Sequence, residues 1–242
     1  MRYVAKRLLS LIPVLLVVSI LVFSLMHLAP GDPASAILGM DATAADLERL
    51  KEELGLNLPL YEQYARWVVG VLHGDLGRSY FMEESVGQAI AGHFRPTLSL
   101  ALFAELIALV LALPAGIYAA CRRGRPADRI VMLLSLLALA VPSFILGLLL
   151  ILLLGVLLAL FPIGGYAPLE EGLLPHLRYL VLPALALGST QAALIARMTR
   201  AAMAEVLDQN FIRTLVAKGM RGGNVVGVHA LRNALFPILT AV

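Results

Sequence analysis

Long apolar blocks alternate with shorter polar segments along this chain, and the length of the blocks sets the expected fold. A helix needs about 20 predominantly apolar residues to cross a hydrocarbon core about 30 Å thick. The pattern predicts four transmembrane spans and the start of a fifth, at about Leu8–Ala29, Leu98–Ala120, Ile130–Phe161 and Tyr179–Ala196, and from Leu235 onward. The third block is long for one crossing, and we expect Pro142 to kink it. The expected fold class is therefore all-α, a polytopic transmembrane helix bundle.

The two ends of the chain need separate interpretation. Basic residues precede the first block, as they do in a signal peptide, but its apolar run is longer than a typical signal core. We therefore interpret the first block as a retained span. The fifth block is eight residues long, Leu235–Val242, which is too short to cross a bilayer. We therefore expect that the chain is truncated or is a fragment.

The longest polar stretch, Pro30–Arg95, is expected to form a small folded loop domain after the first span. Thr43 can cap a helix over Thr43–Leu54, with Asp46 three residues on and Gly55 at its end. A second, amphipathic helix is expected over Leu60–Leu72, and the Gly74–Gly77 run breaks the pattern. We accordingly divide the chain into residues 1–94, the first span with this loop, and residues 95–242, the remaining spans.

Composition agrees with a membrane protein, since 60% of the residues are hydrophobic and 14% are charged. An average soluble domain is about half apolar and a quarter charged. Cys121 is the one cysteine, so no disulfide can form within the chain. His and Cys do not cluster at metal-ligand spacing, and we expect neither a metal nor a cofactor. The basic residues flank the apolar blocks and form no patch with aromatic residues, which argues against nucleic-acid binding.

The positions of Lys and Arg predict the orientation in the membrane. If the N-terminus is cytoplasmic, the inside segments hold three basic residues at the N-terminus, four at 122–129 and six at 197–232, out of 19 in the chain. Cytoplasmic loops carry an excess of Lys and Arg, so the N-terminus is expected inside. The Pro30–Arg95 loop is then extracytoplasmic, and the chain is a multi-pass protein of the cytoplasmic (inner) membrane.

The cytoplasmic segment Glu205–Pro237 is too long for a simple turn between two spans. Asp208 can cap a short helix in it, and Gly219 can end that helix. Four apolar residues share one face of the helix by their spacing, Phe211, Ile212, Leu215 and Val216. Spacing alone leaves two alternatives even: the face packs against another protein, or it folds back on the chain's own helices.

A family resemblance favours the first alternative. The run Phe211–Gly219, followed at a fixed distance by His229–Pro237, resembles the cytoplasmic coupling loop of bacterial ATP-binding-cassette importer permeases of the dipeptide, oligopeptide and nickel type. That family typically reads Tyr-Ile-Arg-Thr-Ala-Arg-Ala-Lys-Gly in the first half, whereas this chain has Leu215-Val216 in place of Ala-Arg. Further segments resemble the family in order and spacing, namely Arg7–Pro13, Pro30–Pro33, Leu54–Leu60, Gly74–Ser79, Arg95–Thr97 and Leu182–Leu185.

The resemblance implies a type I importer in which this chain is a permease subunit and not an enzyme. It implies a second permease subunit, with a heterodimer expected, two cytoplasmic ATP-binding subunits, an extracytoplasmic substrate-binding protein and six spans per permease. The chain has no phosphate-binding loop of its own, which agrees with energy supplied by a partner. The ATPase-coupling residues that it implies are Arg213, Thr214, Ala217, Lys218, Gly219, Arg232 and Asn233.

Several points stay open at this stage. Look-alike permeases carry dipeptides, oligopeptides, glutathione or nickel chelates, so the sequence does not name the cargo. A secondary transporter is the first alternative, but it predicts several intramembrane charges, and Glu105 is the one candidate. A membrane-embedded enzyme is the second alternative; it would need a paired nucleophile and base within the spans, and the sequence shows no such pair there. We interpret Glu105 as a structural carboxylate near the end of its span, because it lies ten residues from Arg95, with a pathway-lining role as the alternative.

Overall fold

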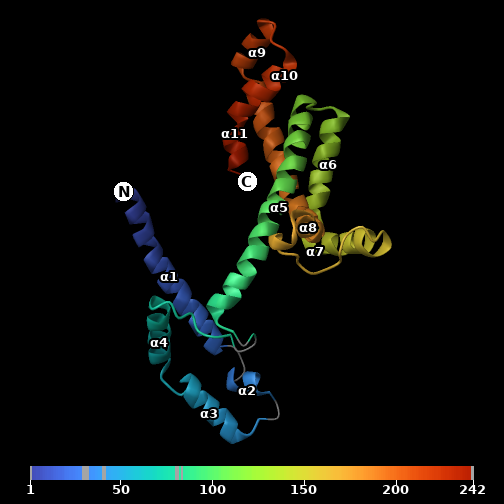
Figure 1. The fold of residues 1–242 in the computed structure, drawn as a ribbon. Helices are drawn as coiled ribbons and strands as arrows, with labels where there is room; N and C mark the ends of the chain where they lie inside the picture. The colour runs from blue at the N-terminus through green and yellow to red at the C-terminus, as the bar shows by residue number, and fades with distance from the viewer. Residues whose placement is uncertain (1, 29–32, 40–41, 80–81, 83, 241–242) are drawn as a thin grey trace. The chain divides into compact units, whose positions relative to one another are not determined.

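The computed structural model describes residues 2–28, 33–39, 42–79, 82 and 84–240. The chain is all-α, as predicted, and Figure 1 shows its helices in order. They are α1 (Arg2–Leu28), α2 (Pro33–Leu38), α3 (Ala44–Leu54), α4 (Leu60–Leu72), α5 (Val86–Cys121), α6 (Pro126–Ala140), α7 (Ser143–Leu150), η1 (Ile151–Leu157), η2 (Leu169–Glu171), α8 (Leu173–Leu207), α9 (Asn210–Ala217), α10 (Gly222–Asn224), η3 (Val225–Ala230) and α11 (Leu231–Leu239). Within the described residues, β-type pairing is confined to one isolated bridge between Arg78 and Ser85. Internal contacts divide the chain into two units, Met1–His93 and Phe94–Val242.

The local signals in the first unit formed the expected elements. In α3, the Thr43 side chain accepts from the Asp46 backbone N–H and the Asp46 carboxylate accepts from the Thr43 N–H, a complete capping box. Gly55 ends the helix in the left-handed conformation at φ 67°. The bounds of α4 are those predicted. Asp75 Oδ1 accepts from the Gly77 N–H at 2.9 Å, so a side-chain-capped turn follows α4.

Side chains of α1 and α4 join these two helices within the first unit. The hydroxyl oxygens of Ser19 and Tyr64 lie 2.8 Å apart, and the Phe23 ring meets the Tyr64 ring edge-on at 5.4 Å between centroids. His27 lies about two turns after Ser19 in α1, and its Nε2 is 3.2 Å from Oε1 of Gln63, the neighbour of Tyr64 in α4. The contact therefore runs along the C-terminal half of α1.

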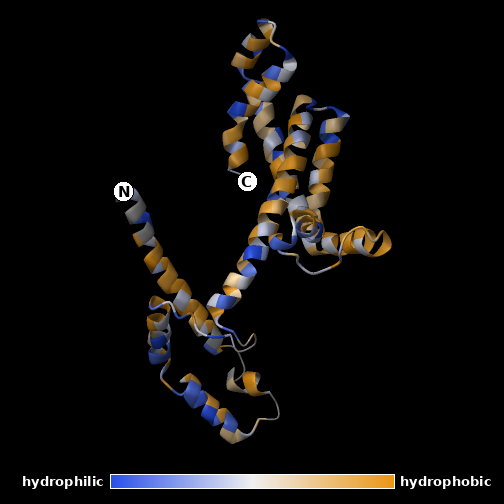
Figure 2. Ribbon diagram, viewed as in Figure 1, coloured by the Kyte–Doolittle hydropathy of each residue, from blue (hydrophilic) through white to orange (hydrophobic). Residues whose placement is uncertain are grey.

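The apolar lengths of the helices agree with a membrane protein. Among the described residues, α5 and α8 are each long and apolar enough to cross a bilayer, and α6 with Ser143–Leu157 makes a third crossing if the bent pair is one span. In α1 the apolar stretch is shorter, Leu9–Leu25, inside a helix of 27 residues. Figure 2 shows apolar residues along α1, α6 and α7 and hydrophilic residues concentrated in α3.

Three span boundaries differ from those predicted. Helix α5 begins at Val86, before the expected Leu98, and runs through Pro96, because the loss of one backbone donor is tolerated in a long apolar helix. Helix α8 begins at Leu173 and continues beyond Ala196 to Leu207. The expected kink at Pro142 is a break instead, since α6 and Ser143–Leu157 meet at 97°. Pro142 and Val141 both have extended backbone there, which interrupts the helix rather than bending it.

Small residues bring α5 and α8 into close contact in the second unit. The face of α5 that is buried carries a small residue at every fourth position, Ala104, Ala108, Ala112, Gly116 and Ala120. A Cβ added to Gly116 would lie 2.6 Å from the Ala196 carbonyl oxygen, and one added to Gly188 would lie 2.7 Å from the Ala104 carbonyl oxygen. These distances are too short for a side chain, so glycine is required at both crossings. The arrangement is the small-residue packing typical of membrane helices.

Candidate coupling loop

The loop after α8 is built on an apolar base supplied by the chain itself. Ile212 of α9 is buried with Met203 and Val206 of α8, Val225 and Ala230 of η3, and Ala234 and Ile238 of α11. Leu215 and Met220 pack on the same cluster. An eight-residue helix is marginal in water, so this packing holds α9 in place.

Part of the apolar face predicted for α9 packs on the chain's own helices, and part is left open to another protein. Ile212 is 5% exposed and Leu215 is partly buried, so these two residues fold back on the chain's own helices. Phe211 and Val216 flank them and are 37% and 58% exposed. The expectation that all four residues form one partner-binding face is therefore wrong for Ile212 and Leu215.

The outward face of α9 is made of small and polar residues. Asn210, Thr214 and Ala217 lie opposite Ile212 by helical spacing, Arg213 lies at the edge of the same face, and all four are exposed. The Thr214 hydroxyl donates to the Asn210 carbonyl oxygen at 3.1 Å within the helix. A surface of this kind lets another backbone approach closely at Ala217 and offers charge at Arg213.

Gly219 ends α9, as predicted, in a two-bond Schellman motif. Its φ is +82°, its N–H donates to the Val216 carbonyl oxygen at 2.9 Å, and the Met220 N–H donates to the Leu215 carbonyl oxygen at 3.2 Å. Glycine adopts this backbone conformation without strain, asparagine tolerates it, and β-branched residues do not. A Cβ on Gly219 would meet nothing within 4 Å, so the requirement for glycine is conformational and not one of space.

The predicted cap of α9 is wrong. Gln209 occupies the N-cap position without a side-chain bond, and Asp208 ends α8 instead. The Asp208 carboxylate accepts from Arg123 Nη1 at 2.6 Å, across 85 residues of sequence. Asp208 therefore ties the end of α8 to the turn between α5 and α6.

A second ion pair joins the same turn to α8, and sequence reasoning missed it. Arg200 donates to both oxygens of Asp128, at 3.0 Å and 2.8 Å, and the Gly124 N–H donates to the same carboxylate at 2.9 Å. The Asp128 side chain is 6% exposed and that of Arg200 is 26% exposed. The partners are 72 residues apart, so no local spacing indicates the pair.

The remaining predicted residues lie on the surface of the loop. Lys218 caps the C-terminal end of α9 and is exposed. Arg232 and Asn233 lie in α11 and are exposed, and the Asn233 amide donates to the His229 carbonyl oxygen at 2.7 Å in its own helical segment. The two halves of the motif are joined by the packing of α9 on η3 rather than by these polar residues.

Comparison with known proteins identifies this arrangement. The family model described as binding-protein-dependent transport system inner membrane component matches residues 112–242, and the model of the N-terminal region of such membrane components matches residues 1–101. The chain belongs to this family. Its members are membrane components of transport systems, which excludes an enzyme and agrees with the multi-pass inner-membrane protein expected from the sequence.

Relatives of this transport component cover nearly the whole chain. A peptide transport system permease protein of Brucella abortus strain 2308 is 44% identical over 237 residues, 98% of this chain and 76% of the relative. Its counterpart in Brucella suis biovar 1 has the same identity and coverage. The glutathione transport system permease protein of Escherichia coli K12 is 40% identical over 240 residues, 99% of this chain and 76% of the relative. The chain is thus a permease of an ATP-binding-cassette importer.

Glu105 lies ten residues after Arg95 in α5. Arg95 Nη1 donates to Glu170 Oε1 at 3.4 Å. Glu105 Oε1 is buried and has no hydrogen-bond partner among the described residues.

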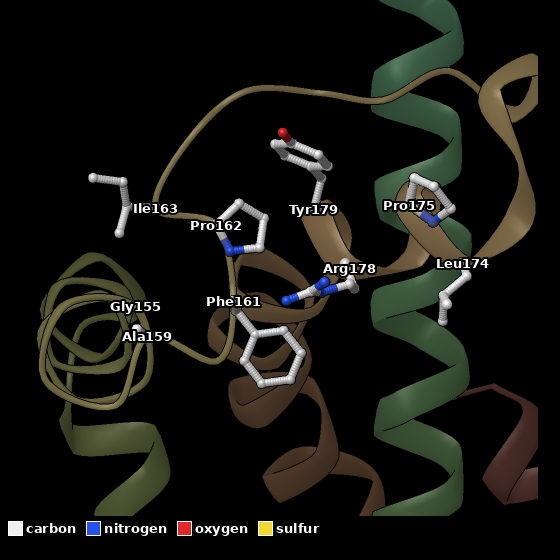
Figure 3. A pocket seen from close by; sticks show the side chains of 9 residues that line it. All are labelled: Gly155, Ala159, Phe161, Pro162, Ile163, Leu174, Pro175, Arg178 and Tyr179. Carbon is white, nitrogen blue, oxygen red and sulfur yellow. The ribbon is translucent and has the colours of Figure 1, made fainter.

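A pocket of about 570 Å³ lies beside the first turns of α8, at the opposite end of that helix from α9 (Figure 3). It is lined by Gly155, Ala159, Phe161, Pro162, Ile163, Leu174, Pro175, Arg178 and Tyr179. Arg178 Nη2 donates to the Leu160 carbonyl oxygen at 2.9 Å, so the one charged side chain of this lining holds the loop after η1 against α8. The sequence carried no motif for this pocket.

Proposed function

We propose that the chain lines the translocation pathway of an ATP-driven importer and couples that pathway to cytoplasmic ATPase subunits through the Glu205–Pro237 loop. The outward face of α9 carries the proposal. It is a small, polar surface that begins with Asn210, ends at Gly219, and rests on a buried apolar base. Such a helix presents a fixed shape to a partner without exposing its own packing residues.

The site residues have three kinds of proposed role: they shape the surface, add charge to it, or fix it in place. Ala217 allows close approach of a groove on the ATPase, and Gly219 turns the chain away from it. Arg213, Lys218 and Arg232 add charged contacts at the rim, where each contributes little affinity. Thr214 bonds within α9, and Asn233 of α11 bonds to His229 of the preceding η3, which fixes the surface that they occupy.

The proposed partners follow from the family and from the absence of a phosphate-binding loop in the sequence. They are a second permease subunit, forming a heterodimer, two cytoplasmic ATP-binding subunits and an extracytoplasmic substrate-binding protein. Residues 1–94 and 95–242 are the proposed functional divisions, with the N-terminus cytoplasmic. The names of the relatives favour a peptide or glutathione-like cargo over a nickel chelate.

The test is to perturb α9 without disturbing its base. Gly219→Val places a β-branched residue at φ +82°, where such residues are genuine outliers, and Ala217→Trp enlarges the exposed contact. Gly219→Asn is the matched control, because asparagine tolerates the left-handed region. Gly223→Val is the positional control, since a Cβ there also meets nothing within 4 Å and φ is not positive.

The measurements are uptake, membrane level, co-purified ATPase and substrate-stimulated ATP hydrolysis in the complete transporter. We expect the two test variants to insert in the membrane at normal levels and to lose uptake. Each should also lose either the co-purified ATPase or the substrate-stimulated ATP hydrolysis. Both controls should keep uptake, the co-purified ATPase and stimulated hydrolysis. Wild-type ATPase retention and stimulation in both test variants would show that this loop is not the coupling element. Uptake that continues without ATP, driven by an ion gradient, would favour the secondary transporter.

A further inference from the structure

Helix α4 has an apolar stripe that the first unit leaves uncovered. Tyr61, Ala65, Val69 and Leu72 fall on one side of α4 by their spacing, away from Tyr64 and Gln63, which contact α1. Tyr61 is 75% exposed, Val69 53% and Leu72 79%. The Glu62 and Arg66 side chains, paired at 2.9 Å, lie beside this stripe on the polar side of the helix.

The contact with α1 sets the depth of α4 in the membrane. Tyr64 meets Ser19, which lies inside the apolar stretch Leu9–Leu25 and nine residues before the end of α1. At 1.5 Å per residue, Ser19 is about 13 Å from that end along the helix axis. The point at which α4 is attached therefore lies well within the apolar part of α1, not beyond it.

The turns of α1 around this attachment are apolar, and the first unit leaves them exposed. Ile20, Leu21 and Val22 directly follow Ser19 and are 43%, 57% and 54% exposed. They belong to the apolar stretch Leu9–Leu25, whose composition suits contact with acyl chains. Helix α4 is attached beside these turns of α1, and its stripe faces away from the attachment.

We propose that the Tyr61–Leu72 stripe of α4 faces lipid, with α4 lying at the boundary between headgroups and acyl chains. An interfacial helix has one apolar face, a charged or polar face, and aromatic residues at headgroup level. Tyr61 is such an aromatic residue on the stripe, and the Glu62–Arg66 pair marks the side that faces water. The predicted extracytoplasmic loop is thereby anchored to the membrane surface, independently of how the transporter is powered.

Spin labels at single positions test this in the purified transporter, reconstituted in bilayers after its other cysteines have been replaced. Labels at Tyr61 and at Leu72 report on the stripe. Val22 in α1 serves as the membrane reference, Arg66 as the matched position on the polar side of α4, and Glu53 in α3 as the water reference. Collision rates of each label with oxygen, which concentrates in lipid, and with a water-soluble nickel chelate are compared.

The expected result is an oxygen-to-nickel accessibility ratio at Tyr61 and Leu72 that is several-fold higher than at Arg66 and approaches that at Val22. A ratio at both stripe positions equal to that at Glu53 would place α4 in water and overturn the proposal. Low accessibility to both reagents with immobilised spectra would show that a protein subunit covers the stripe, which would also overturn it. Each labelled variant must retain wild-type uptake, so that a misfolded loop is not measured.

Discussion

The two ion pairs at the turn between α5 and α6 differ in burial, and this difference predicts very different effects of mutation. Asp128 and Arg200 are largely buried, with 6% and 26% side-chain exposure, whereas Arg123 and Asp208 are 58% and 70% exposed. Replacing Arg200 with Met leaves a buried carboxylate whose remaining interactions among the described residues are the Gly124 N–H bond and the nearby charge of Arg123. Breaking a buried pair in this way typically costs about 3–5 kcal/mol. Breaking an exposed pair costs about 0–1 kcal/mol.

We therefore expect Arg200→Met to destabilise the permease by about 3 kcal/mol. In a protein of this size 1 kcal/mol corresponds to roughly 2–4 °C, so the midpoint should fall by roughly 6–12 °C. The assay is the temperature at which the detergent-solubilised transporter loses its monodisperse peak on size exclusion. Arg123→Met is the matched control, and its midpoint should change by no more than about 4 °C.

The double variant Asp128→Leu with Arg200→Met distinguishes the electrostatic reasoning from a general loss of packing. Removing both charges also removes the desolvated carboxylate, and replacing a whole buried pair by apolar residues is often neutral. We expect the double variant to be more stable than Arg200→Met alone. The reasoning is refuted if Arg200→Met stays within about 2 °C of wild type, or if the double variant is the least stable of the set.

Two further predictions concern topology and the membrane-embedded carboxylate. In a background without Cys121, a cysteine at Ser79 should react with a membrane-impermeant reagent from outside and one at Arg125 should not, because Lys and Arg accumulate on the cytoplasmic side; the reverse pattern would contradict the orientation. Glu105→Gln should leave uptake and membrane level unchanged, since Oε1 makes no hydrogen bond that the substitution would remove; loss of uptake at a normal membrane level would instead assign Glu105 to the pathway.

Signals confined to a few residues were read correctly from the sequence. The Thr43 capping box, Gly55, the bounds of α4 and the role of Gly219 each depend on hydrogen bonds within about five residues, so composition and spacing suffice. The all-α membrane fold was equally accessible, because the apolar blocks have the length of a bilayer crossing.

Features that depend on the relative placement of helices could not be predicted. Asp208 has the right spacing to cap α9, yet Arg123 lies near enough to take its carboxylate. Spacing predicted the apolar face of α9. It did not show that the chain itself buries Ile212 and leaves Val216 exposed. Pro142 marked the position of an interruption, whereas the 97° angle depends on how both arms pack on α8.

The contact between α5 and α8 also restricts how the permease can change shape. Alanine and glycine have no side-chain rotamers, so a surface built from Ala108, Ala112 and Gly116 has no second set of conformers with which to repack. Sliding one helix along the other would drive Cβ atoms into backbone at the Gly116 and Gly188 crossings. The two helices are therefore expected to move together as one rigid body. Conformational change during transport then requires hinges where the helical backbone is already interrupted, such as the Val141–Pro142 break.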